Sequence, residues 1–72
     1  MAKSEAYIMN ELRVIASNWN ISIHEAARWD IQDYFEGEDE MQNWARRLSD
    51  EDVIKEYVKI KLDYYNKYPT QF

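Results

Sequence analysis

The sequence predicts an all-α fold, a small compact bundle of four helices. Its 72 residues include one glycine and one proline, so the chain has few of the turns that a series of strands would need. Hydrophobic residues make up 46% of the chain, which is enough for a core. They recur at helical spacing in four segments, and we expect a single domain over residues 1–72 with helices at about 4–18, 23–36, 39–48 and 50–68.

The first two helices have recognisable starts. Ser4 is the expected N-cap of the first, and its apolar residues fall within about 120° of one another around Leu12. These residues are Ile8, Met9, Ile15, Ala16 and Trp19. Ser22 and Glu25 predict a capping box at the second helix. Gly37 stands where a left-handed C-terminal cap is expected.

Two residues do not fit the apolar stripe of the second helix. Trp29 points away from Tyr34 on a helical wheel and lies outside the stripe. We favour burial of Trp29 between two layers over contact with a partner, because a tryptophan has a large area to bury. Asp30 lies on the core side and is read as a rim position, with Arg13 and Lys61 as possible salt-bridge partners.

The third helix is short and follows an acidic turn. Asp39 and Gln42 have the spacing of a capping box. Four apolar residues then have the i, i+3, i+4, i+7 spacing of a buried stripe, namely Met41, Trp44, Ala45 and Leu48. Arg46 and Arg47 lie off that stripe near the C-terminus, where the helix dipole favours cations, and are read as a solvated helix end.

The fourth helix is the longest, with Ser49 as N-cap and Pro69 as its stop. Its apolar residues cover about 200° of the wheel, whereas packing on one neighbour uses about 100°. This helix therefore has more apolar surface than one neighbour can cover. Lys61 lies inside that arc, and we favour a stem laid along the core over a pair with a partner's carboxylate. The tail after Pro69 is expected to fray.

The negative charge is concentrated in the middle of the chain. The whole chain carries −5, and residues 36–56 hold eight acidic and three basic residues, which is also −5. Proteins that bind nucleic acid usually show a basic patch instead. The chain has no cysteine, no apolar signal segment and no run long enough to span a membrane, so a cytoplasmic protein is expected.

Residues that could support catalysis are scarce. His24 is the only histidine, and Arg28 stands where a zinc-protease motif starting at His24 would need a second one. The acidic turn 36–40 lacks the ligand spacing of a calcium loop, and one glycine cannot make a phosphate-binding loop. No enzymatic activity, cofactor or metal ion is expected.

A non-enzymatic binding protein is the function that these observations favour. The hypothesis is a regulator or inhibitor that docks on a basic protein surface, in its most specific form a phage- or mobile-element-encoded protein that acts on a nucleic-acid-handling machine by charge mimicry. The expected contact residues are Glu36, Glu38, Asp39, Glu40, Asp50, Glu51, Asp52 and Trp29.

Two alternatives stay open. The first is a structural homodimer in which the surplus apolar face of the fourth helix packs on its own copy, through Tyr57, Lys61, Tyr64 and Tyr68. The second, a minor one, is DNA or RNA binding through Arg46, Arg47 and the lysines of the fourth helix.

Overall fold

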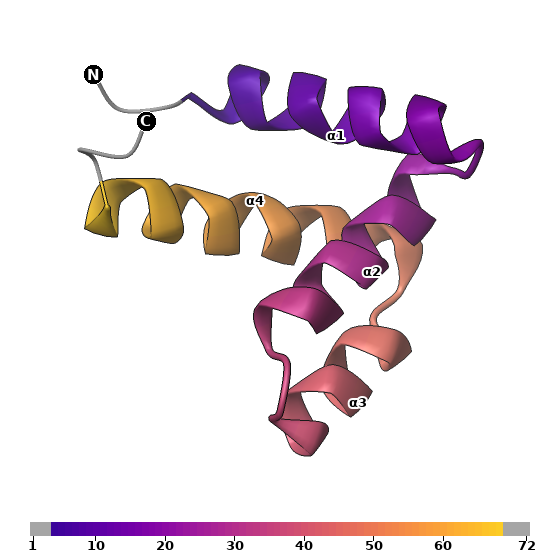
Figure 1. Ribbon diagram of the computed structural model, residues 1–72, viewed down its shortest axis with the longest axis vertical. Coiled ribbons are helices and arrows are strands. Elements are labelled where there is room, and N and C mark those ends of the chain that lie inside the picture. Colours follow the sequence, from indigo (N-terminus) through magenta and orange to yellow (C-terminus); the bar gives the residue numbers. More distant parts are fainter. Residues whose placement is uncertain (1–3, 69–72) are drawn as a thin grey trace.

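The computed structural model describes residues 4–68 and confirms the all-α bundle, with no strand in this part of the chain (Figure 1). The helices are α1 (Glu5–Trp19), α2 (Ile23–Tyr34), α3 (Asp39–Arg47) and α4 (Asp50–Lys67). Their bounds agree with the predicted ones to within two residues. The predicted fraying after Pro69 lies outside the described residues.

Serine caps begin three of the helices, as predicted. Ser4, Ser22 and Ser49 each accept a backbone N–H on the hydroxyl oxygen, in every case from the third residue along and at 3.1 Å. These bonds satisfy amides that have no partner inside the helix. At the other end of α1, Asn20 takes a left-handed conformation (φ 58°), and its N–H donates to the carbonyls of Ala16 and Ser17.

The turn between α2 and α3 differs in two details from the prediction. α2 ends at Tyr34, two residues earlier than expected, and Gly37 has the positive φ of 87° that favours glycine. The N-cap of α3 is Glu38, whose side chain makes no capping bond, so the capping box between Asp39 and Gln42 is wrong. The amide of Gln42 instead donates to the carbonyl oxygen of Gln32 (3.0 Å), a tertiary contact that sequence spacing does not reveal.

α1 and α4 lie side by side and run antiparallel, and α2 runs obliquely from the C-terminal end of α1 across α4 (Figure 1). α3 packs against α2, at the end of the molecule away from α1. α4 therefore packs on two helices of its own chain, and this accounts for its wide apolar arc. The residues of α4 that are buried there are Val53, Tyr57, Val58 and Tyr65.

The core lies where α1, α2 and α4 meet. Ile8, Leu12 and Ile31 are at most 1% exposed there, and Ala26 and Ala27 let the neighbouring helices come close to α2. Trp19 does not join them: it is 54% exposed. It is the last residue of α1, and the chain turns away directly after it, so the predicted place in the buried stripe is wrong.

Candidate protein interface

A polar cluster between α2 and α4 contains two of the residues that were candidates for a dimer seam. Lys61 Nζ lies 3.0 Å from Asp30 Oδ2, and 5.7 Å from the centre of the Tyr57 ring. Of the two partners considered for Asp30, the structure thus selects Lys61. Tyr57 is 2% exposed, and burial, followed by the neighbouring Asp30 carboxylate, raises the pKa of its hydroxyl. Tyr57 is therefore a core residue, and its assignment to a dimer seam is corrected.

A second internal polar contact joins α4 to α1. The Tyr65 hydroxyl donates to Glu11 Oε1 at 2.7 Å. The pKa of Tyr65 is raised, first by burial and then by this hydrogen bond and by the charge on the carboxylate. The Tyr65 hydroxyl therefore acts as a hydrogen-bond donor that holds α4 to α1.

The start of α4 is held by Arg28 of α2. Arg28 Nη2 donates to the carbonyl of Leu48 (2.8 Å) and to Asp50 Oδ1 (2.7 Å). The hydrogen bond from Arg28 lowers the pKa of Asp50. Glu51 pairs with Lys55 at 3.5 Å along the same helix. Two of the acidic residues expected to contact a partner thus have partners within the chain.

Arg46 is also engaged within the chain. Its Nε donates to Gln32 Oε1 and its Nη1 to Asn43 Oδ1, both at 2.9 Å. Gln32 is 9% exposed, and its bonds with Arg46 and Gln42 link α3 to α2. The sequence did not predict this network, because a glutamine on one face of a helix does not indicate which distant side chains it will bond. Because Arg46 makes these two hydrogen bonds within the chain, it is a less favourable residue for binding a phosphate of DNA or RNA.

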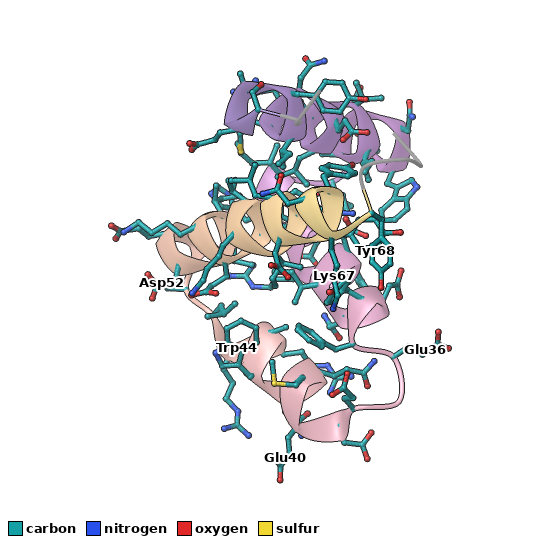
Figure 2. All side chains as sticks on the ribbon, turned by 90° about the vertical axis from the view of Figure 1, so that its left-hand side faces the viewer. Glu36, Glu40, Trp44, Asp52, Lys67 and Tyr68 are labelled. Atoms are coloured by element: carbon teal, nitrogen blue, oxygen red, sulfur yellow. The ribbon has the colours of Figure 1, made fainter. Side chains whose placement is uncertain are left out.

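The seven predicted contact carboxylates are all exposed, but they do not form one surface. α3 separates them into two groups, and Figure 2 shows Glu36 and Glu40 well apart from Asp52. Asp50, Glu51 and Asp52 form the group at the start of α4, where the helix dipole favours them. The other group is called the corner carboxylates: Glu36, Glu38, Asp39 and Glu40. Within residues 4–68, none of these four has a basic group within 4.0 Å.

Trp29 is exposed, against the internal burial that we favoured from the sequence. Its side chain is 51% exposed. All three neighbours of α2 pack on its other sides, where Ala26, Ala27, Ile31 and Gln32 are buried. A partner therefore has access to Trp29.

The remaining tyrosine candidates for a dimer seam lie in an aromatic group, the tyrosine patch, formed by Tyr34, Tyr64 and Tyr68, of which Tyr64 is half-buried. The ring centres are 6.2 Å apart between Tyr34 and Tyr64, and 5.2 Å apart between Tyr64 and Tyr68. Tyr34 is 44% exposed and Tyr68 is 41% exposed. The patch joins the C-terminal ends of α2 and α4, and Figure 2 shows Tyr68 beside Lys67 at that end of α4.

The described residues contain no group of three or more side chains that could hold a metal ion. Among the helices of residues 4–68, none has both the length and the apolar character needed to cross a bilayer. Comparison of the chain with protein-family models, with curated proteins and with solved structures finds no match.

Proposed function

We propose that this chain is a small, acidic, non-enzymatic binding protein that docks on a basic surface of another protein. The observation that supports this most directly is the set of corner carboxylates. All four are exposed, none has a basic group within 4.0 Å among the described residues, and they lie within five consecutive positions. The proposal leaves out Asp50, which pairs with Arg28, and also Glu51 and Asp52, which lie at the start of α4.

Unpaired, exposed carboxylates suit a steering and docking role. Their field attracts a basic surface over about 8 Å at physiological ionic strength. Contacts at the rim of an interface then keep much of their hydration, so the desolvation cost is small. A partner surface that normally binds nucleic-acid phosphate has the same chemistry, and a regulator or inhibitor that acts by charge mimicry is the finer form of this proposal.

The test compares two variants with equal net charge. The corner variant carries Glu36→Gln, Glu38→Gln, Asp39→Asn and Glu40→Gln. The control carries Glu5→Gln, Glu51→Gln, Asp52→Asn and Asp63→Asn, four other exposed carboxylates, so each variant changes from −5 to −1. With a nona-arginine peptide as probe at low salt, we expect the corner variant to lose about tenfold in affinity and the control about threefold or less.

Calorimetric titration measures the affinities, and circular dichroism checks that both variants keep their helical content. Affinity of the parent protein should also fall as salt is raised, because exposed charges are screened. Equal losses in the two variants would show that only net charge matters, and would overturn the assignment to the corner.

Self-association through the tyrosine patch is the second candidate, because Tyr34 and Tyr68 leave aromatic surface uncovered. Packing on α1 and α2 already occupies much of the wide arc of α4, which leaves less of it for a second copy. We therefore expect light scattering after size-exclusion chromatography to give a monomer mass at all concentrations and salt levels. A dimer that persists in high salt, and that Tyr68→Ser dissociates while Tyr7→Ser does not, would favour this candidate instead.

A further inference from the structure

The outer face of α2 carries an exposed tryptophan between two acidic residues. Glu25, Trp29 and Asp33 follow one another at intervals of four, so they span about 80° of the helix surface and neighbouring side chains lie about 5–6 Å apart. All three are exposed. This row of three residues, called the outer face of α2, is therefore continuous and open to a partner.

Nothing in the described part of the chain complements this face. Neither Glu25 nor Asp33 has a basic group within 4.0 Å among residues 4–68. Arg28, the basic residue next to Trp29, is turned away toward Leu48 and Asp50. The face thus has an aromatic surface with a negative charge on either side and no cation of its own among these residues.

The chemistry of the face selects a cation with an extended, planar shape. A guanidinium stacks on an indole ring and can direct its N–H groups toward carboxylates beside that ring. A lysine ammonium is a compact, strongly hydrated charge that cannot satisfy the ring and both carboxylates in the same way. We propose that the outer face of α2 binds an arginine side chain of a basic protein partner, stacked on Trp29 between Glu25 and Asp33.

This inference rests on the proposed function and names the anchor of the same interface. Glu36 follows Asp33 just beyond the end of α2, so the outer face leads into the corner carboxylates. One basic surface could therefore contact both. Other occupants fit less well: phosphates of nucleic acids and anionic lipids would meet two carboxylates, and a second copy placed symmetrically would bring the same negative face against itself.

The experiment titrates the full-length protein with nona-arginine and, separately, with nona-lysine. The three tryptophans supply the readout, because each indole N–H gives its own NMR signal and single Trp→Phe variants assign them. Trp19 is the internal control, since it is 54% exposed and Trp29 is 51% exposed. We expect the Trp29 signal to move during the arginine titration while the Trp19 signal stays in place.

Two variants then measure the contribution of the ring. Trp29→Ala is expected to weaken nona-arginine binding about tenfold, as for an aromatic residue that anchors an interface, and Trp19→Ala by less than about twofold. The parent protein should bind nona-arginine more tightly than nona-lysine, and Trp29→Ala should remove that preference. Both replaced side chains are exposed, and circular dichroism verifies that the variants stay folded.

The outcomes separate this inference from the proposed function. If the parent protein binds neither peptide, both are overturned. If binding depends on the corner carboxylates but leaves the Trp29 signal and the Trp29→Ala affinity unchanged, only the arginine site is overturned. Equal binding of the two peptides would likewise reject a site selective for arginine.

Discussion

Leu12→Ala is expected to lower the free energy of unfolding by about 2–5 kcal/mol. Leu12 is fully buried on α1 and belongs to the core cluster shared with α2 and α4. The substitution removes buried methyl groups and leaves a cavity that packed helices fill only in part. A domain of this size has a total stability of about 4–11 kcal/mol, so the loss is a large share of the whole.

Urea denaturation followed by circular dichroism measures this loss. Val14→Ala is the matched control, because Val14 lies on the same helix and is 52% exposed. We expect the control to change stability by no more than about 0.5 kcal/mol, since it touches no buried contact. Similar losses in the two variants would mean that α1 does not pack on the core through Leu12.

Alkaline pH is expected to destabilise the protein steeply. The pKa values of Tyr57 and Tyr65 are raised in the folded chain above the ordinary value of 10.0, because both residues are buried and lie near carboxylates. Below pH 10 both are protonated in either state, so their contribution is fully present. Above pH 10 they ionise in the unfolded chain first, and this contribution is lost as pH rises toward the folded pKa.

The expected slope for Tyr57 is about 1.4 kcal/mol per pH unit above pH 10, since one proton is then bound by the folded state alone. Tyr65 is expected to contribute a slope of the same size, because the folded state again holds one proton that the unfolded chain has lost, but over a shorter pH range because this residue is less buried. Denaturation at a series of pH values measures both.

Tyr57→Phe should remove about half of this alkaline slope just above pH 10, because the contribution of Tyr65 remains. Tyr34→Phe is the control, since the Tyr34 side chain is 44% exposed and its loss should leave the profile unchanged. A profile for Tyr57→Phe parallel to that of the parent protein would show that the Tyr57 hydroxyl is not the source of the loss.

The candidate interface was only partly predictable from the sequence. The sequence places the corner carboxylates in one turn, and local spacing alone shows that they lie close together. It also groups them with Asp50, Glu51 and Asp52, but α3 holds the two groups apart (Figure 2). A charge count along the chain contains no information about that separation.

The sequence by itself determined the features that local interactions produce. These are the four helices, the serine caps at Ser4, Ser22 and Ser49, and the positive φ at Gly37. Each depends on residues within one turn of helix. Only the tertiary structure decided that the wide apolar arc of α4 packs on α1 and α2. It also decided that Asp30 pairs with Lys61 and that Trp29 is exposed. A helical pattern shows which side chains share a face, but which neighbour covers that face depends on how distant segments pack.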